Sequence, residues 1–550
     1  MELIKTSETW RLVALVPFLG LVYGAYSMYK ARSFFRRLQR LGYPMPPHHP
    51  IWGHLGVIAS VMKDLPPDLM PTVALGEYFR RRYPHLDQAF YLDQWPFSKP
   101  MLVLLSPDAA RQISQGVALP KDPGQHEFLT PLTGGHDLDT MEGDEWKFWH
   151  NVFSPGFRVS NIAALVPNMV EMVNVFCEHL RQQARRGDKP FHLSPMALDL
   201  TMDLSSKSIW DHELHSQTGY NAFSAALASQ LSWLHYYGTS PLKDLNILRP
   251  FMQWYNARRM DTYIDRVLSQ KPRPGMRDKT GAISVLDTAN IPQDPVHVKV
   301  LPKVIRSQIK FMMLAGYDTT GSSIVFMTHL LSKHPEVLAR VRAEHDDVLG
   351  PDISAAPKLI AANPKLLNLL PYTTAVIKES LRFYPPGATS RYGNPDFQIV
   401  IKSSKTEGKD GVTGGTLALP TDRIVCMAIH HGIHHNPRYW ERPHEFIPER
   451  FLEKAKDDPL QPPANGWRPF ERGPRACIGQ EMALTEIKMV CAMTAREFDF
   501  KPAYDEMGPQ PAPQIDNDHV YLVSRGGAAN PSGYYPCRIS YTTRHSNVQP

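Results

Sequence analysis

The sequence predicts a mainly α-helical protein with small β-sheets, carried on one N-terminal transmembrane helix. The run Leu12–Tyr29 has no charged residue and is followed by Lys30, Arg32, Arg36, Arg37 and Arg40. A run of this length is about sufficient to cross a bilayer as a helix. Positive charge just after it favours a cytoplasmic position for the rest of the chain. We therefore expect residues 1–43 to form a membrane anchor with a basic flank.

A proline-rich segment separates this anchor from the body. Residues 44–50 read PMPPHHP, which is incompatible with a helix and predicts an extended hinge before a body at residues 51–550. Helical spacing dominates between residues 100 and 270, and the regular helices we expect are Asn161–Arg181, Val304–Leu331, a helix from Pro335 to Gly350, and Tyr372–Tyr384. Short strands are expected at Phe397–Ile401, Leu417–Leu419 and Val520–Val523.

Composition excludes several classes of function. The formal net charge of +6 is small for 550 residues and the basic residues are not gathered into a stripe, so we expect no nucleic-acid partner. The cysteines are Cys177, Cys426, Cys477, Cys491 and Cys537, and none forms a CxxC pair. This pattern argues against a disulfide scaffold and a zinc module, and it fits a reducing compartment.

One cysteine lies in a loop with the features of a metal site. The loop Phe470–Gly479 leads directly into a helical pattern, so Cys477 is expected near a helix N-terminus. Free amides and the helix dipole there stabilise the thiolate, which is the form that binds a metal. Gly473 and Gly479 would let the backbone pass close to a flat macrocycle. The alternative is a buried structural cysteine, the commonest fate of a single Cys.

This loop resembles the haem-binding loop of the cytochrome P-450 family, Phe-x-x-Gly-x-Arg-x-Cys-x-Gly. Every fixed position is matched, by Phe470, Gly473, Arg475, Cys477 and Gly479. The resemblance implies the cytochrome P-450 fold and a haem whose iron is bound by the Cys477 thiolate, which favours cleavage of the oxygen–oxygen bond. It also implies that Arg475 pairs with a haem propionate and that Phe470 keeps water from the sulfur.

A second motif interrupts the long apolar helix. Residues 315–320 read AGYDTT, where glycine and threonine run against helix propensity, and such violations often mark functional sites. The segment is similar to the family's Ala-Gly-x-Asp-Thr-Thr motif over the distal face of the haem. The resemblance implies that Thr319 hydrogen-bonds to the bound oxygen and a water, and that Asp318 helps to relay protons. Glycine would also remove a side chain that blocks a ligand. The alternative is a helix with a packing glycine and a polar patch.

Two charged residues match the family's scaffold. Glu379 and Arg382 have its Glu-x-x-Arg spacing, and the segment Pro448–Phe451 supplies Arg450 to complete a network. The resemblance implies that these three residues hold the cysteine loop in register. An ordinary surface ion pair is the alternative.

Further residues are candidates for the edge of the haem. Trp146 and His150 are similar to a Trp-x-x-x-Arg helix of the family whose Trp and Arg approach the propionates, with His150 in place of arginine. Core packing is the alternative for this pair. Arg391, which follows Pro385-Pro386 as in the family, is another candidate propionate ligand.

The activity implied is that of a haem-thiolate monooxygenase that inserts one atom of O2 into a lipophilic organic substrate. No GxGxxG loop is present, so electrons from NADPH would arrive through NADPH–cytochrome P-450 reductase docked near Arg468, Arg472 and Arg475, with cytochrome b5 as an additional candidate partner. The resemblance places the protein in the endoplasmic reticulum membrane with its catalytic domain facing the cytosol. Residues 92–96 and 154–157 resemble fungal enzymes of secondary metabolism.

Two other functions remain open from the sequence. One is a haem-thiolate isomerase or dehydratase that needs no external electrons, and the other is a non-catalytic haem-binding membrane protein. The substrate site would be lined by Phe311, Met312 and Ala315, for which core packing is the alternative.

Overall fold

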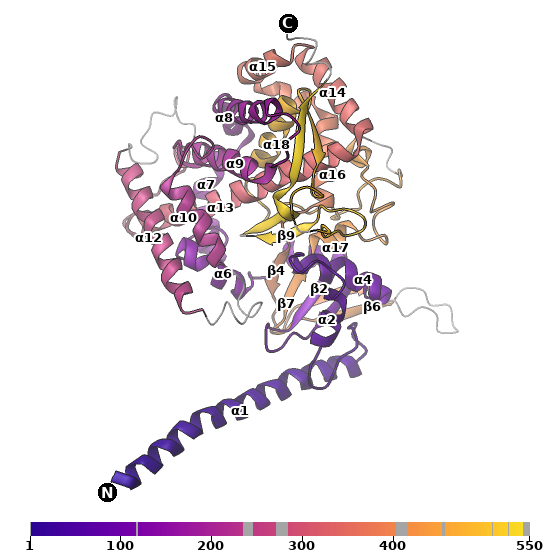
Figure 1. The fold of residues 1–550 in the computed structure, drawn as a ribbon. Coiled ribbons are helices and arrows are strands. Elements are labelled where there is room, and N and C mark those ends of the chain that lie inside the picture. Colours follow the sequence, from indigo (N-terminus) through magenta and orange to yellow (C-terminus); the bar gives the residue numbers. More distant parts are fainter. Residues whose placement is uncertain are drawn as a thin grey trace, which may run out of the picture.

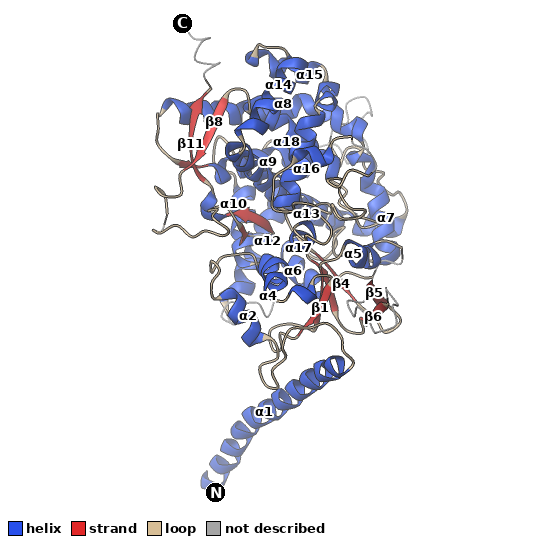
Figure 2. Ribbon diagram, turned by 90° about the vertical axis from the view of Figure 1, so that its right-hand side faces the viewer, coloured by secondary structure: helices blue, strands red, loops and turns tan. Residues whose placement is uncertain are grey.

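The computed structural model describes residues 2–116, 119–234, 246–270, 284–402, 415–453, 457–508, 510–525 and 527–542. Helices make up most of the body and small sheets lie among them, which confirms the predicted fold class (Figures 1 and 2). The first helix, α1 (Glu2–Arg40), projects away from the body (Figure 1).

A long central helix organises the helical part. Helix α13 (Pro295–Lys333) passes through the body, and α9 (Leu193–Trp210) packs along it (Figure 1). The other described α-helices of the body are α2 (Leu55–Met62), α3 (Pro71–Val73), α4 (Phe79–Arg82), α5 (Pro107–Ser114), α6 (Pro123–Thr133), α7 (Gly143–Phe153), α8 (Val159–Arg185), α10 (Ala222–Trp233), α12 (Leu248–Ser269), α14 (Pro335–Leu349), α15 (Ala356–Ala362), α16 (Pro371–Phe383), α17 (His430–His434) and α18 (Gln480–Thr494).

The largest sheet has the strand order β1-β2-β7-β4. Its strands are β1 (Ala89–Leu92), β2 (Met101–Leu104), β7 (Val425–Ala428) and β4 (Thr389–Tyr392). Strand β2 pairs with β7 in parallel, and the other two pairings are antiparallel. The smaller sheets are β3-β11-β8, β5-β6 and β10-β9, with strands β3 (Phe191–His192), β5 (Gln398–Lys402), β6 (Thr416–Pro420), β8 (Phe498–Pro502), β9 (Leu522–Arg525), β10 (Ala528–Pro531) and β11 (Pro536–Tyr541).

The expected elements are present with shifted ends. The helix expected from Val304 begins at Pro295, because the side chain of Asp294 accepts a hydrogen bond from the amide of His297 and caps a helix with proline at its first position. Pro167 lies inside α8, eight residues beyond its first residue, Val159. The strand expected at Val520–Val523 is β9, shifted toward the C-terminus.

The last turns of α1 pack on the body. Arg32 Nη1 donates to Asp93 Oδ2 at 2.5 Å, and His48 Nε2 lies 2.8 Å from the same oxygen. Phe35 and Leu38 are buried in the cluster formed with β1, β2 and β7. The segment that links α1 to the body therefore adds contacts of its own to the fold.

Candidate functional site

The cysteine loop is held by its own backbone and by α5. The amide of Cys477 donates to the carbonyl of Phe470 at 2.8 Å. Cys477 lies two residues before Gly479, the N-cap of α18. Gly473 has φ +92°, and a Cβ there would lie 2.1 Å from the carbonyl oxygen of Ser114. Gly473 is thus required by its left-handed backbone and by the close approach of α5.

The thiol of Cys477 experiences two opposing influences. The residue as a whole is exposed, yet protein surrounds the thiol densely enough that lost hydration raises its pKa, which is the larger effect. The amide of Gly479 at the start of α18 acts in the other direction. The thiolate stabilisation expected from the helix terminus is therefore present but is the smaller of the two. Metal coordination deprotonates such a thiol.

A buried ion network lies behind this loop. Arg382 donates from Nε and Nη2 to the two carboxylate oxygens of Glu379 at 2.7 and 2.8 Å, and its remaining N–H groups reach the carbonyls of His434, Pro443 and Glu445. Arg450 Nε donates to Glu379 Oε1 at 3.2 Å. All three charged side chains are fully buried. The expected contacts are thus found in the interior and not on the surface.

His434 joins this network to the cysteine loop. Its Nδ1 lies 3.0 Å from the carbonyl oxygen of Arg382, and its Nε2 accepts from the amide of Arg468 at 3.0 Å. Burial lowers its pKa well below the usual value, so the ring is neutral with Nδ1 protonated. Sequence reasoning missed His434, whose only signal is the run His430-His431-Gly432-Ile433-His434-His435.

Three buried cations gather near the loop. Arg391 on β4, Arg475 and Lys121 influence one another electrostatically, and burial lowers the pKa of each. Lys121 Nζ lies 2.6 Å from Asp139, and Arg475 Nη2 donates to the carbonyl of Met141 at 2.9 Å. Arg391 Nε and Arg475 Nη1 are buried without a hydrogen-bond partner among the described residues. Such N–H groups are expected to bind an anion.

Trp146 and His150 lie beside this cluster. The guanidinium of Arg475 lies over the Trp146 ring, 4.5 Å from its centroid. The ring centroid of His150 is 4.9 Å from that of Trp146. Burial is the main cause that lowers the pKa of His150, and the charge of Arg475 adds to it. His150 is therefore neutral at pH 7.

The expected motif of α13 presents two different faces. Ala315 is exposed and Thr319, one turn later, is half-buried, although α13 is largely enclosed. Thr319 Oγ1 donates to the carbonyl of Ala315 at 2.7 Å, which leaves its lone pairs available to a donor. A Cβ at Gly316 would lie 2.5 Å from Oγ of Ser205. Gly316 thus makes room for α9, which corrects the expectation that it clears space for a ligand.

Asp318 lies on another side of the same helix. Its Oδ2 accepts from the amides of Gly527 and Ala528 at 3.0 and 2.8 Å, and its Oδ1 accepts from Asn530 Nδ2 at 3.1 Å. Burial is the main cause that raises its pKa to about 6, and the three hydrogen bonds oppose that rise. Sequence reasoning did not find these partners, which lie more than 200 residues away in the chain.

Some other expectations change at the level of single residues. Arg468 is fully buried and donates to Ser114 Oγ at 2.6 Å, so it cannot contribute to a docking surface, and Arg475 is also largely enclosed. Arg472 is exposed. Of the expected lining residues, Met312 is buried in the core and Phe311 is half-buried, whereas Ala315 has open surface.

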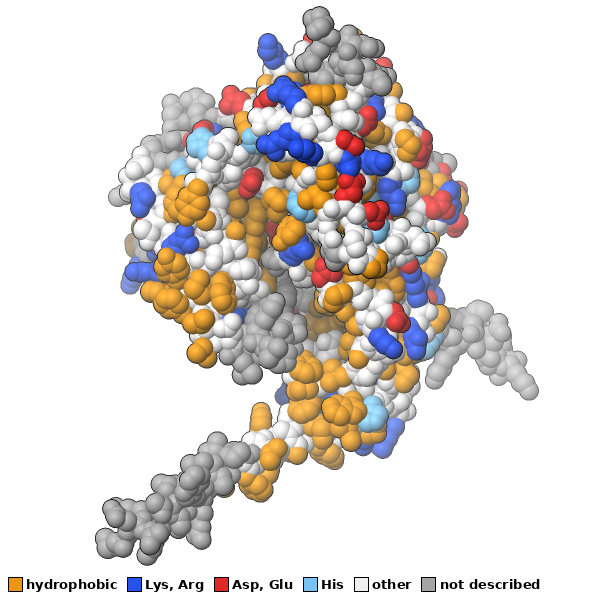
Figure 3. Space-filling view, in the orientation of Figure 1, with side chains coloured by type: hydrophobic (Ala, Val, Ile, Leu, Met, Phe, Trp, Pro, Cys, Tyr) orange, Lys and Arg blue, Asp and Glu red, His pale blue; other side chains and the backbone are white. Residues whose placement is uncertain are grey.

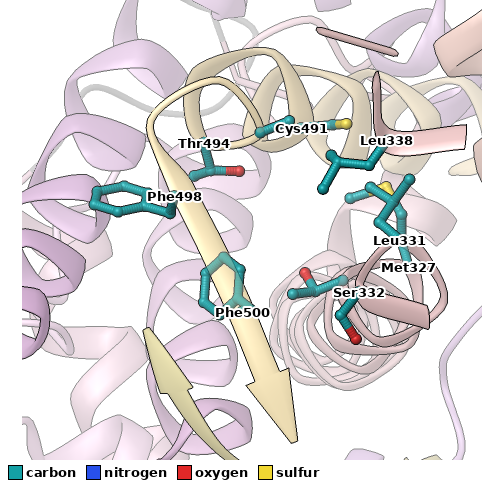
Figure 4. Close-up of a pocket in the computed structure, with 10 residues that line it drawn as sticks. Met327, Leu331, Ser332, Leu338, Cys491, Thr494, Phe498 and Phe500 are labelled. Atoms are coloured by element: carbon teal, nitrogen blue, oxygen red, sulfur yellow. The ribbon is translucent and has the colours of Figure 1, made fainter. Parts of the chain in front are cut away.

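Two cavities lie near these elements. One, of about 30 Å³, lies between the C-terminal part of α13, α14, α18 and β8 and is lined mainly by apolar side chains such as Met327, Leu331 and Phe498 (Figure 4). It has room for little more than a water molecule. The other is a polar hollow of about 320 Å³ beside the buried cations, and Lys121, Asp139 and Glu142 line it.

Comparison with known proteins identifies the family. The sequence profile of the cytochrome P450 family matches residues 44–517. The chain belongs to this family. Cytochrome P450 monooxygenase polC of Polytolypa hystricis is 42% identical over 96% of this chain and 94% of its own length. Cytochrome P450 monooxygenase acrF of Aspergillus aculeatus is 35% identical over 81% and 90%. The solved cytochrome P450DA heme domain shares the fold, with a TM-score of 0.66 and 20% identity over 92% of this chain and 98% of that chain.

The protein is therefore a cytochrome P450 monooxygenase, an oxidoreductase that uses a haem-thiolate, O2 and electrons from a reductase. The donor set of this P450 fits that cofactor. Cys477 would offer one soft thiolate donor to the iron, and the unpaired N–H groups of Arg391 and Arg475 would offer two sites for the carboxylates of a porphyrin. Within the described ranges, no three His, Cys, Asp or Glu side chains form a metal cluster.

Proposed function

We propose that this chain is a membrane-anchored monooxygenase that inserts one oxygen atom into a lipophilic organic substrate in fungal secondary metabolism. The observation that carries the proposal is Cys477 at the start of α18 together with the buried, unpaired N–H groups of Arg391 and Arg475. Identity to fungal P450 monooxygenases supports the metabolic setting.

The residues of this chain have separate tasks. A bound haem supplies the iron at which O2 is activated. Cys477 would bind the haem iron through its thiolate, and Arg391 and Arg475 would bind the propionates. Phe470 would keep water from the sulfur, and Trp146 would lie beside the propionates. Thr319 accepts a hydrogen bond near the reacting oxygen. Asp318, with a pKa of about 6, exchanges protons with solvent near neutral pH.

Membrane anchoring is supported by exposed apolar side chains on one side of the molecule. On α1, residues including Phe18, Leu21 and Tyr23 are exposed. The start of α12 exposes Phe251 and Trp254. Hydrophobic side chains gather at α1 and at the adjoining edge of the body (Figure 3). Among the described residues, α8 is long and apolar enough to span a bilayer, but it packs in the core against α9 and α18.

We assign residues 1–43 to the anchor and its basic flank, residues 44–50 to the hinge and residues 51–550 to the catalytic domain, in the endoplasmic reticulum membrane and facing the cytosol. Carbonate extraction of microsomes tests the anchor. The full chain is expected in the pellet and a variant that lacks residues 2–29 in the supernatant. Release of the full chain by carbonate would contradict the assignment.

The electron donor is an NADPH-dependent flavoprotein reductase, with cytochrome b5 as a second donor. The exposed cation on the cysteine loop is Arg472, whose Nε donates to the carbonyl of Trp467 at 3.1 Å. Arg472→Glu is expected to slow reduction by the reductase severalfold, more at low salt than at high salt. An unchanged rate at low salt would move the docking surface elsewhere.

The central test is the carbon monoxide difference spectrum of the reduced full-length protein in microsomes. Wild type is expected to show a strongly red-shifted Soret band, and Cys477→Ala is expected to lose it. Cys491→Ala is the matched control, since Cys491 is a buried cysteine on α18, the helix that follows Cys477. Loss of the band in both variants, or its presence in Cys477→Ala, would contradict the ligand assignment. NADPH consumption with the reductase then excludes an isomerase or a non-catalytic haem protein.

A further inference from the structure

The carboxylate of Asp318 is bound to the β9–β10 hairpin, and no cation pairs with it among the described residues. Two backbone amides, of Gly527 and Ala528, donate to one oxygen and Asn530 Nδ2 donates to the other. Asn530 itself is fixed, because its Oδ1 accepts from Ser322 Oγ at 2.9 Å and its backbone pairs with Val523 on β9. The acid, the amide and the serine are all buried. Asn530 therefore supplies the side-chain donor of a closed network.

This network holds Asp318 away from the face that carries Thr319. Successive residues of a helix point about 100° apart, so the two side chains leave α13 in different directions. The Thr319 hydroxyl donates to the carbonyl of Ala315, a residue with open surface, whereas the Asp318 carboxylate accepts from the amide of Ala528 on β10. A proton held by Asp318 reaches the Thr319 side only when the carboxylate leaves the hairpin.

We propose that Asn530 is a positioning residue that latches Asp318 to the hairpin and thereby restrains proton delivery toward Thr319. The inference rests on the proposed role of Asp318 in proton transfer and adds a residue that controls it. Without the amide, the carboxylate keeps only its two backbone donors. It is then bound less firmly and turns away from β10 more often.

The latch is tested with the full-length holoenzyme in microsomes. Dithionite-reduced protein is mixed with O2, and the rate of reoxidation is measured in H2O and in D2O, which requires no substrate. Asn530→Leu is expected to reoxidise about threefold to tenfold faster, because proton delivery is less restrained. Asp318→Asn is expected to reoxidise more slowly and to lose the solvent isotope effect. The double variant is expected to behave like Asp318→Asn, since Asn530 acts only through Asp318.

A second readout does not depend on the haem reaction. Hydrogen exchange at the amides of Gly527 and Ala528 is expected to be about tenfold faster in Asn530→Leu than in wild type. Ser322→Ala removes the bond that orients Asn530 and should shift both readouts in the same direction by less. Thr328→Ala is the control, because Thr328 lies further along α13 and its hydroxyl likewise donates to a carbonyl one turn back, that of Ile324. It should change neither the reoxidation rate nor the hydrogen exchange.

The outcomes separate the two claims. If Asp318→Asn slows reoxidation but Asn530→Leu changes neither readout, the latch is wrong and the role of Asp318 stands. An effect of Asn530→Leu that persists in the Asp318→Asn background also overturns the latch. If Asp318→Asn leaves reoxidation and its isotope effect unchanged, the proposed role of Asp318 falls, and the latch falls with it.

Discussion

Two buried arginines of this P450 differ in how their N–H groups are used. The guanidinium N–H groups of Arg382 all donate, to the Glu379 carboxylate and to three carbonyls. Arg391 is equally buried but donates only to the carbonyl of Ser390 at 3.3 Å, and its Nε has no partner in the described part of the chain. A buried donor without a partner costs free energy, so it is retained where a ligand repays that cost. The first arginine stabilises the fold, and the second is available to bind.

The largest expected effect is at the Glu379 carboxylate of the buried ion network. Glu379→Gln leaves Arg382 and Arg450 without their counter-charge and should destabilise the fold by about 3–5 kcal/mol. Thermal unfolding and the yield of folded protein measure this loss. Glu178→Gln, in an exposed pair with Arg181 and Arg185, is the control and should change stability by less than about 1 kcal/mol. If Glu379→Gln changed stability as little as Glu178→Gln, the Glu379 carboxylate would not stabilise the fold as proposed.

For a buried carboxyl that has no arginine partner among the described residues, the stability of the fold should depend on pH. Burial raises the pKa of Glu486 on α18 to about 8, above its usual 4.5. The folded state then holds a proton that the unfolded state loses, so stability falls as pH rises from about 4.5 to about 8. Glu486→Gln should flatten the pH dependence of the melting temperature in this range and raise it at pH 8.5. Parallel pH profiles of the two proteins would contradict the assignment.

Loss of the available arginines should weaken haem binding more than folding. Arg391→Leu and Arg475→Leu each remove a charge-assisted hydrogen bond to a propionate, so haem should leave about tenfold to hundredfold faster. Transfer of haem to apomyoglobin measures the rate. Arg306→Leu, in an exposed pair with Asp265, provides the baseline. If the arginine variants unfold without faster haem loss, Arg391 and Arg475 would stabilise the fold, as Arg382 does, and would not bind the propionates.

The smallest effect is expected at His150. Burial lowers its pKa, so the ring carries no charge at pH 7. His150→Gln should change the rate of haem loss by less than about threefold between pH 6.5 and 8, since a neutral side chain replaces a neutral side chain. A large change would mean that the protonated ring, like Arg475, binds a propionate.

Local patterns in the sequence predicted the parts of the site that local chemistry decides. The loop of Cys477 is defined within ten residues, and the cap at Asp294 and the glycine at 473 act over short distances. The long central helix was predicted because its apolar pattern continues for many turns. Glu379, Arg382 and Arg450 were grouped by family spacing, and in the structure both arginines form ion pairs with Glu379.

Contacts across the fold were not predictable in this way. The hairpin around Asn530 follows Asp318 by 212 positions, and no periodicity links them. His434 could not be separated from its neighbouring histidines until β7 and α17 placed it beside Arg382 and Arg468. The burial of Arg468 was likewise hidden, because a basic residue near a glycine-rich loop reads as a surface residue in the sequence.

The junction of Arg32, Asp93 and His48 has a mechanical consequence. Because these side chains fasten the end of α1 to Asp93, just after β1, direct contacts bridge the proline-rich hinge and join the helix to the body more stiffly than a free hinge would. From Glu2 to Arg32 the helix extends about 45 Å at 1.5 Å per residue. Once residues 12–29 are seated in a bilayer, any tilt of that helix rotates the whole body. A change in bilayer thickness that alters the tilt would then change which face of the body lies against the lipid.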